Sequence, residues 1–439
     1  MYCPYCNFRI DSYHQSVCPN CHHTIPEQMN SQMRSEMMGK AQQNYPKAQP
    51  RAQAAPVAVP PDFQEPRLPP KQGGSGGSIK LLIILLVVFL YFFPATQPYV
   101  KPHVDSGIDT VTGYWDDATS PYIIIPEHAQ YVLERDITIT VEGGSGHFDV
   151  HFPDVPQTPW TNETQWGDTI QSIKNFDEAV IQGDSFVNTT RNGSWLSYSG
   201  DLSDGQEVHI RLTYTVEAHA IRWDERIDET NSGTVADIPQ ELKDKYNHDE
   251  QMKDGSGSRI DFIEVEKYRD LAENITKDEP TVFGKVKAIY DYVDENIVYI
   301  RGRDPKACTE TLEKGHGDCD DMSVVFVSLA RAVGIPAWVN FGLLTDSSFS
   351  SWGGHSWVEV YIPTNDGNYV QAQLDLANNL FLVYSPTRLL EWGDNGNDED
   401  LIHFYYYFSS SGVGDVDIKQ SFNTQDFSSA GEVRIKVDA

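Results

Sequence analysis

An apolar run at residues 79–95 limits what this chain can fold into more than any other feature. These 17 residues contain one charge, Lys80, and follow a Gly/Ser-rich stretch at 73–78. The run reaches the lower limit of length for a helix that spans a bilayer. A buried helix is rarely apolar on every face, and a cleaved signal peptide would begin near residue 1. We therefore expect a transmembrane helix at 79–95.

Charge around this run predicts the orientation. Residues 1–80 hold 8 Lys/Arg against 5 Asp/Glu, a net +3, whereas the remainder holds 25 against 59, a net −34. Because positive flanks stay in the cytoplasm, we expect a single-pass protein of the cell membrane with a cytoplasmic N-terminus and an extracytoplasmic body. That acidic body would repel a phosphate backbone, so nucleic acid is not an expected partner.

Two Cys-Pro-x-Cys pairs stand before the run, and each can place two thiolates on one tight turn. Four thiolates complete a tetrahedral zinc shell, and the cytoplasm keeps such thiols reduced. Two disulfides or free thiols are the alternatives. We predict a structural zinc ribbon over residues 1–24, which can also bind a cytoplasmic protein partner, with the ligands Cys3, Cys6, Cys18 and Cys21.

The segments on either side of the run look like connectors. Residues 25–78 are rich in Gln, Ala and Pro and keep no apolar period, which is typical of a disordered linker. Residues 96–120 are expected to form a stalk. From 121 to 235 apolar residues alternate with polar ones, as in Val208–Val216, which predicts an antiparallel β-sandwich. A spacer, a carbohydrate binder and a protein-docking module all remain open for it.

The period changes from about residue 236, and we expect an α+β domain over 236–410. Apolar residues at three- and four-residue spacing predict helices at 262–275 and 283–297, and strands follow from about 337 to 385. The aromatic run 403–408 is interpreted as a buried strand. Residues 411–439 are assigned to a C-terminal segment whose last strand is Val433–Val437.

A third helix should begin at Cys319. Apolar residues recur from Met322 to Val333, and Gly334-Ile335-Pro336 ends the pattern. Backbone N–H groups and the dipole at a helix N-terminus favour a thiolate, so this is a suitable position for a nucleophilic cysteine. The neighbouring Asp318, Asp320 and Asp321 oppose that charge.

A predicted hairpin supplies partners for the cysteine. Strands at 355–362 and 368–375 flank the turn Pro363–Gly367. If that five-residue loop is symmetric, His355 lies opposite Asp375, with Cβ atoms roughly 4.5–5.5 Å apart. A carboxylate there would fix the imidazole tautomer. Each of the three residues alone is more often structural, but together they predict a catalytic triad.

Three blocks of this region resemble the transglutaminase-like (transglutaminase core) superfamily, in particular membrane-anchored prokaryotic or archaeal members with an N-terminal zinc ribbon. They are Thr311–Asp321 with Leu329–Ala337, His355–Tyr361, and Leu374-Asp375. The resemblance covers about 240–390 and implies a papain-like fold. It also implies Cys319 as the nucleophile, His355 as the general base and Asp375 as the acid that orients it.

The resemblance implies an enzyme that acts on amide bonds of a protein or peptide outside the membrane through a thioester. We expect a hydrolase, a protease or amidase, with a protein-crosslinking transamidase as the variant that uses an amine in place of water. The alternative is a non-catalytic receptor or scaffold with a cytoplasmic zinc ribbon. A Cys308–Cys319 disulfide would silence the enzyme, and Asp394 with Asp398–Asp400 offers a weak Ca²⁺ site.

Overall fold

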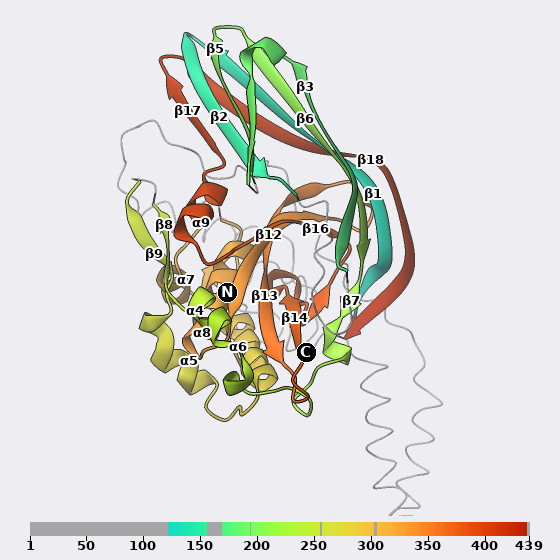
Figure 1. Ribbon diagram of the computed structural model, residues 1–439, viewed down its shortest axis with the longest axis vertical. Helices are drawn as coiled ribbons and strands as arrows, with labels where there is room; N and C mark the ends of the chain where they lie inside the picture. Colours follow the sequence, from blue (N-terminus) through green and yellow to red (C-terminus); the bar gives the residue numbers. More distant parts are fainter. Residues whose placement is uncertain (1–121, 156–168, 194, 255–256, 303–304, 437–439) are drawn as a thin grey trace, which may run out of the picture. The chain divides into compact units, whose positions relative to one another are not determined.

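The computed structural model describes residues 122–155, 169–193, 195–254, 257–302 and 305–436 (Figure 1). The predicted zinc ribbon, linker, transmembrane helix and stalk lie outside these ranges. Within them, no helix combines the length and apolar character that a bilayer span requires.

Two four-stranded antiparallel sheets face each other in one half of the described structure. The first has the order β18-β1-β6-β3 and the second β17-β2-β5-β4. Side chains of both sheets, such as Phe148 and Leu212, form one buried core, so the arrangement is the expected sandwich. The strands are β1 (Tyr122–Glu142), β2 (Ser145–Pro153), β3 (Gln171–Gln182), β4 (Asn188–Asn192), β5 (Trp195–Ser203), β6 (Glu207–His219), β17 (Phe408–Gly412) and β18 (Asp415–Lys436).

The C-terminal strand is far longer than the predicted Val433–Val437. β18 pairs with β1 from Tyr122↔Lys436 to Glu142↔Asp415, with one irregularity at Val132/Leu133. Its first half alternates, with Val416, Ile418 and Phe422 partly buried against the sandwich core, but residues 425–432 are all exposed and mostly polar, which hides the full length of the strand in the sequence. Residues beyond 407 thus complete both sheets of the sandwich (Figure 1).

The aromatic run 403–408 is not a strand, contrary to our expectation. Helix α9 spans Asp398–Tyr405 and β17 begins only at Phe408. The Asn397 side chain caps the helix by accepting a hydrogen bond from the Glu399 N–H, and three acidic residues occupy the first turn. These signals at the helix start outweigh the β-propensity of the aromatic residues.

Helices cover one face of a second mixed region. The predicted helix at 283–297 is α6 (Val282–Asn296), capped by Thr281. The helix predicted over 262–275 is shorter, because Phe262 belongs to a strand and α5 begins at Arg269. The other elements up to the end of α8 are β7 (Ile221–Arg222), α4 (Gln240–Tyr246), β8 (Glu250–Lys253), β9 (Arg259–Ile263), α5 (Arg269–Ile275), β10 (Val298–Tyr299), α7 (Cys308–Lys314), β11 (His316–Gly317) and α8 (Cys319–Ala332), with short 3₁₀ turns between them.

Helix α8 lies against an antiparallel sheet with the order β14-β13-β12-β16. These strands are β12 (Ala337–Thr345), β13 (Trp352–Pro363), β14 (Tyr369–Leu374) and β16 (Arg388–Gly393), and β15 (Val383–Tyr384) pairs with β7. Helices α5, α6 and α7 pack against the other sides of α8, so nearly all its side chains are buried. A helix enclosed in this way fixes the position of its first residue, Cys319.

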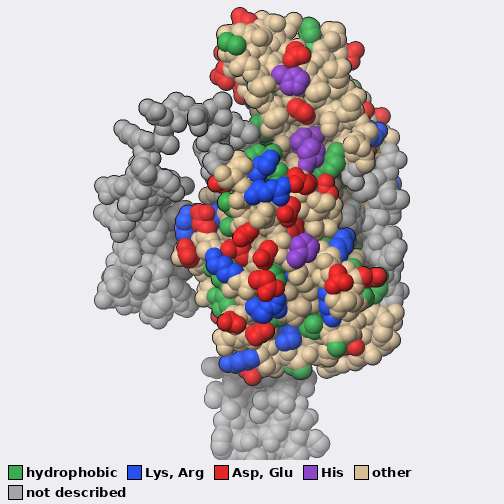
Figure 2. All heavy atoms as spheres, turned by 60° about the vertical axis from the view of Figure 1, so that its left-hand side comes forward, with side chains coloured by type: hydrophobic (Ala, Val, Ile, Leu, Met, Phe, Trp, Pro, Cys, Tyr) green, Lys and Arg blue, Asp and Glu red, His purple; other side chains and the backbone are tan. Residues whose placement is uncertain are grey.

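The sheet of β12 and β16 contributes side chains to the core of the sandwich. Leu343 of β12 and Leu389 of β16 are buried in the sandwich core. On the face seen in Figure 2, acidic and basic side chains intermix over the lower part, so the net negative charge is not gathered in one patch there.

Candidate active site

The turn before α8 needs its glycines. Gly315 has φ +63° and ends α7 in the left-handed conformation that glycine adopts without strain. A Cβ on Gly317 would lie 2.4 Å from the Cβ of Asp321, so only glycine fits there. Asp318 then caps α8, and its side chain and that of Asp321 bond each other's backbone N–H groups. Cys319 is the first residue of the helix, as expected, and is 9% exposed.

The hairpin exists, but the predicted register is wrong by two residues. Pro363 pairs with Tyr369 and Val358 with Leu374, so Pro363 belongs to β13 and the loop is Thr364–Asn368. Asp366 organises this loop by accepting hydrogen bonds from the Thr364 hydroxyl and the Asn368 N–H. Because the shift is even, every side chain stays on its predicted face.

His355 and Asp375 meet despite the register error. Asp375 follows β14 and caps the 3₁₀ turn Leu376–Asn378, and its Oδ2 lies 2.9 Å from Nε2 of His355. Both side chains are almost fully buried. Since Nε2 faces the carboxylate, Nδ1 is the ring nitrogen through which this imidazole could exchange a proton with another group.

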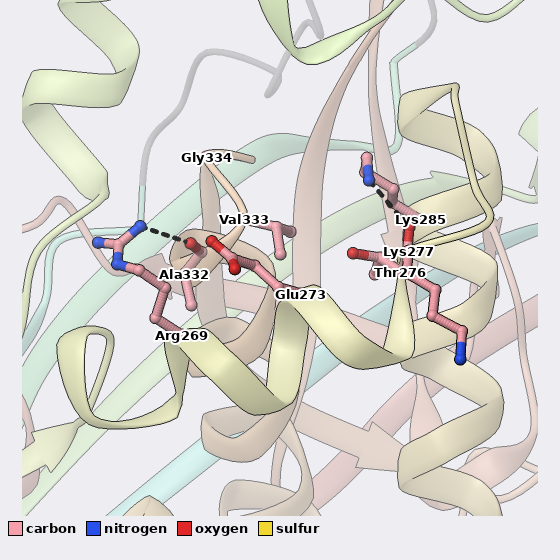
Figure 3. Close-up of a pocket in the computed structure, with 8 residues that line it drawn as sticks. All are labelled: Arg269, Glu273, Thr276, Lys277, Lys285, Ala332, Val333 and Gly334. Carbon is pink, nitrogen blue, oxygen red and sulfur yellow. Dashed lines mark hydrogen bonds between the residues drawn. The ribbon is translucent and has the colours of Figure 1, made fainter.

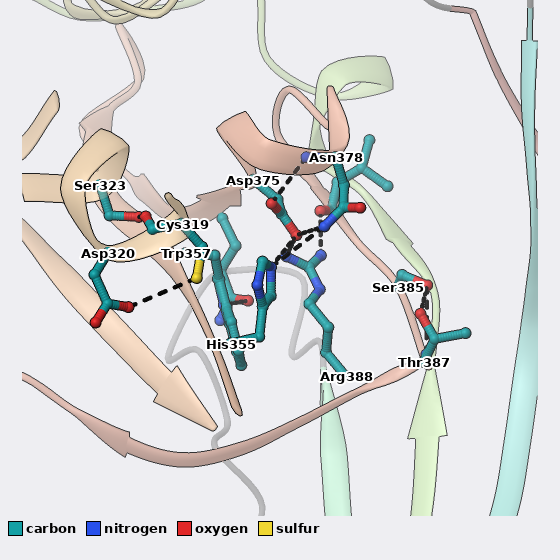
Figure 4. A network of polar contacts seen from close by, with 12 residues as sticks. Cys319, Asp320, Ser323, His355, Trp357, Asp375, Asn378, Ser385, Thr387 and Arg388 are labelled. Carbon is teal, nitrogen blue, oxygen red and sulfur yellow. Dashed lines mark hydrogen bonds and ion pairs between the residues drawn. The ribbon is translucent and has the colours of Figure 1, made fainter. Parts of the chain in front are cut away.

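Cys319 and His355 come from elements that pack together, α8 and β13. In Figure 4 the imidazole of His355 lies between the sulfur of Cys319 on one side and the carboxylate of Asp375 on the other. The structure therefore brings the three predicted residues together in the order thiol, imidazole, carboxylate. That order is the one required of a nucleophile, a base and an orienting acid.

Comparison with known proteins finds a family match over this part of the chain. Residues 269–373 match the transglutaminase-like superfamily. The chain contains a transglutaminase-like domain. Cys319 and His355 lie inside the matched range, and Asp375 lies just after it. Since the match covers less than half of the chain, it describes this domain and not the whole protein.

Three further proteins are similar to the chain. An uncharacterized protein of Bacillus subtilis, YebA, is 32% identical over 243 residues, which are 50% of this chain and 30% of YebA. The chain thus spans under a third of that relative. A candidate cysteine protease from Cytophaga hutchinsonii is 17% identical, with a TM-score of 0.45, over 70% of this chain and 93% of its own. The periplasmic domain of TgpA from Pseudomonas aeruginosa is 14% identical, with a TM-score of 0.27, over 55% and 88%.

Arg388 contacts the candidate site and was missed by sequence reasoning. Its Nη1 lies 3.2 Å from Oδ2 of Asp375, and its Nη2 donates to the Val383 carbonyl. Burial opposes ionisation of Asp375, but the charges of His355 and Arg388 and the hydrogen bonds from His355 and Asn378 hold its pKa below the ordinary value. Arg388 opens a strand far along the chain, and no local motif marks it.

A second missed feature is a polar chain behind His355. Trp357 stacks beside the imidazole at 5.8 Å between ring centroids and donates its Nε1–H to Gln373. Gln373 and Asn340 both donate to Oε2 of the buried Glu359. Burial raises the pKa of Glu359 to about 7, against these two hydrogen bonds. This series of hydrogen bonds fixes the ring of Trp357, against which His355 packs.

Acidic groups crowd Cys319 as expected. Its thiol lies 3.7 Å from Oδ1 of Asp320, whose other oxygen accepts a hydrogen bond from the Tyr405 hydroxyl. Burial, and then the charge of a neighbouring aspartate, raises the pKa of Asp318 and of Asp321 to about 6. Lys306 pairs with Asp321 and offsets part of this repulsion. Below about pH 6 both carboxyl groups are therefore mostly protonated, and the negative charge beside the thiol is smaller.

The other residues singled out from the sequence lie elsewhere. Cys308 and Cys319 are both free thiols, and burial raises the pKa of Cys308 to about 12. Asp394 lies 2.9 Å from the buried Arg331, and Asp398 and Glu399 pair with Arg259. These three of the acids considered above for calcium are thus engaged with cations of the chain itself, and Asp400 accepts a hydrogen bond from the Asn395 side-chain amide.

A cavity of about 310 Å³ lies away from the three residues (Figure 3). It is lined by α5, the start of α6 and the last turn of α8, including Arg269, Lys285 and Ala332. Cys319 is at the other end of α8, roughly 20 Å away for a helix of this length. At that distance the cavity is separate from the candidate active site. Its cations Arg269 and Lys285 also already donate hydrogen bonds to backbone carbonyls.

Proposed function

We propose that the chain is a cysteine-type amidase or peptidase in which Cys319 is the nucleophile, His355 the general base and Asp375 the orienting acid. The observation that carries this proposal is the buried 2.9 Å contact between His355 and Asp375, on a ring that faces the cysteine at the start of α8. The transglutaminase-like match over residues 269–373 supports it independently.

The reaction would proceed through a thioester. The Cys319 sulfur, after losing its proton to Nδ1 of His355, attacks the amide carbonyl carbon. The tetrahedral intermediate collapses, the C–N bond breaks, and the leaving amine takes the proton from the imidazolium. Water then gives a proton to His355 and attacks the thioester, which releases the acid and restores the thiol. A primary amine in place of water would give crosslinking.

The start of α8 supplies electrostatic help in this scheme. Backbone N–H groups in a first helical turn lack intrahelical acceptors and point toward the helix start. The N–H of Cys319 would be one donor to the oxyanion of the tetrahedral intermediate. Tyr299, opposite Gly317 in the β10–β11 pair, is our candidate for a second donor. Asp375, held ionised by Arg388, would stabilise the imidazolium.

We further propose the setting expected from the N-terminal part of the chain. Residues 79–95 would anchor the protein in the cell membrane, with the catalytic domain outside and the zinc ribbon of Cys3, Cys6, Cys18 and Cys21 inside. A protein or peptide outside the membrane would be the substrate, and a cytoplasmic protein could bind the ribbon. Protease protection of the ribbon in right-side-out vesicles, with cleavage of the body, tests this topology.

The catalytic proposal is tested by alkylation and turnover. Full-length protein is treated with iodoacetamide under reducing conditions, and the labelled cysteine is located by peptide mapping. We expect rapid labelling at Cys319 and cleavage within a broad peptide library. Cys319→Ala should remove both. Cys308→Ala is the matched control and should change neither, since Cys308 is buried.

The same experiment separates the alternatives. Incorporation of a fluorescent primary amine, dependent on Cys319, would indicate a transamidase. A folded protein with no preferential labelling at Cys319 and no turnover of amides would overturn the enzymatic proposal and favour a surface receptor or scaffold.

A further inference from the structure

Three metal-ligating side chains gather on the outer face of the sandwich, far from the candidate triad in sequence. His128 of β1 lies directly opposite His219 of β6, and Gln130 lies opposite Glu217 in the same ladder (Figure 1). The alternate residue Ala129 is buried in the core, so His128 projects to the other side of the sheet. The backbone pairing of two strands therefore fixes the positions of all three ligands.

The donor atoms are close enough for one ion. They all lie within 4.8 Å of one another. Nε2 of His128 is 3.3 Å from Oε1 of Glu217, and Nε2 of His219 is 3.9 Å from the same oxygen. A tetrahedral zinc with bonds of 2.0–2.1 Å sets its ligands about 3.3 Å apart. The distance from Nε2 of His128 to Oε1 of Glu217 already has this value. The His219 side chain is 47% exposed and has room to turn toward the other two ligands.

Lys174 is the one cation beside the cluster, among the described residues that contact it. Its Nζ lies 2.5 Å from Oε2 of Glu217, the oxygen that does not face the imidazoles. Oε1, which also accepts a hydrogen bond from Gln130, remains directed at the two rings. Lys174 therefore orients the carboxylate without occupying the metal side, but its charge should weaken the binding of a cation.

The donor set selects the class of metal. Two imidazoles and one carboxylate suit Zn²⁺ and the later divalent transition metals, whereas Ca²⁺ and Mg²⁺ require six or more oxygen ligands. We propose that His128, Glu217 and His219 bind one Zn²⁺ on the outer face of the sheet, where it ties β1 to β6. Water completes its coordination. This ion is distinct from the zinc of the predicted ribbon and does not depend on the proposed catalytic function.

The test uses the full chain with Cys3, Cys6, Cys18 and Cys21 changed to Ser, so that the ribbon binds no zinc. This background and its His128→Ala/His219→Ala derivative are dialysed against 10 µM ZnCl₂ and their metal content is measured. We expect the background to hold one zinc more than the derivative. His209→Ala is the matched control, because His209 is also on the outer face of β6 but pairs with Asp136, and it should change nothing.

Two further readouts distinguish a built site from a hydrogen-bonded surface cluster. Lys174→Gln should raise the zinc affinity several-fold. Saturating zinc should raise the melting temperature of the background by on the order of 3–5 °C, because only the folded sheet binds it, and should not raise that of the derivative. Equal zinc contents in background and derivative, or equal stabilisation of both by zinc, would overturn the proposal. Any zinc common to both belongs to another site, such as Cys319 with His355.

Discussion

His355 and His128 each contact a carboxylate, at 2.9 Å and 3.3 Å, yet they lie in opposite surroundings. The side chains of His355 and Asp375 are 0% and 1% exposed, whereas those of His128 and Glu217 are 27% and 23% exposed. The buried carboxylate also contacts a buried arginine, Arg388. The surface carboxylate contacts a lysine that is 52% exposed.

This difference shows what burial adds to a histidine–carboxylate contact. Water screens the surface cluster, so its members contribute little to stability and can rearrange around an added ion. In the buried site each charge needs a fixed partner, because an uncompensated charge there is costly. The buried site is therefore rigid and intolerant of change, as a catalytic group should be.

The largest effect should follow from Asp375→Asn. The substitution keeps the shape but removes the charge that supports a charged His355, so turnover should fall on the order of 10³–10⁴-fold. The rate of Cys319 alkylation at pH 7 should fall as well. Asp346→Asn, at a surface loop, is the control and should leave both unchanged. A folded Asp375→Asn protein with normal rates would remove Asp375 from the proposed triad.

Removal of Arg388 should mainly affect stability. Arg388→Met leaves Asp375 buried with less compensation, and we expect the free energy of unfolding to fall by about 3–5 kcal/mol. Arg211→Met provides the surface comparison, because Arg211 pairs with Asp136 on the exposed face and should cost less than about 1 kcal/mol. Urea denaturation of both variants measures the difference. Equal losses of unfolding free energy in the two variants would contradict the distinction between the buried and the surface region.

The pH dependence of stability should have opposite signs in the two regions. In the wild type, burial raises the pKa of Asp318 to about 6, so stability contributed by its protonated form is lost as pH rises from about 4 to 6. Asp318→Asn keeps an equivalent helix cap but does not titrate. As the pH rises over that range, its free energy of unfolding should therefore increase by on the order of 2 kcal/mol relative to that of the wild type.

Asp136 supplies the contrasting case. Burial opposes its ionisation, but Arg211 and His209 hold its pKa below the ordinary value. Its stabilisation is present above the unfolded pKa of about 3.9 and is lost as pH falls through the folded value. Asp136→Asn should therefore be less stable than the wild type at pH 5, with a difference that shrinks at lower pH. Thermal unfolding between pH 2.5 and 7 checks both variants, and slopes of the same sign would contradict this account.

The smallest effect is expected at the surface cluster without metal. In zinc-free buffer Glu217→Gln should change the free energy of unfolding by less than about 1 kcal/mol, because Glu217 and its partners are reached by water. Chemical denaturation in the presence of a chelator measures it. A loss as large as that of Arg388→Met would show that the cluster is a structural hub and not an adaptable surface site.

Local patterns in the sequence determined much of the transglutaminase-like region. The spacing of apolar residues located α6 and α8 and predicted that α8 begins at Cys319. Period-two alternation and a turn signal located the hairpin. The two residues are not opposite one another in the ladder, as the predicted register had them, but a register error of two residues leaves each side chain on its face, so the contact between His355 and Asp375 was predicted correctly.

Only the tertiary structure decided the rest. Arg388 joins Asp375 because β16 closes the sheet beside β12, and β18 completes the sandwich although its own residues are mostly polar. His128 and His219 become neighbours through the pairing of β1 with β6, which are separated in the chain by four other strands of the sandwich and more than sixty residues. Local propensity and periodicity report a residue's own segment, whereas buried ion pairs and ligand clusters depend on which segments pack together.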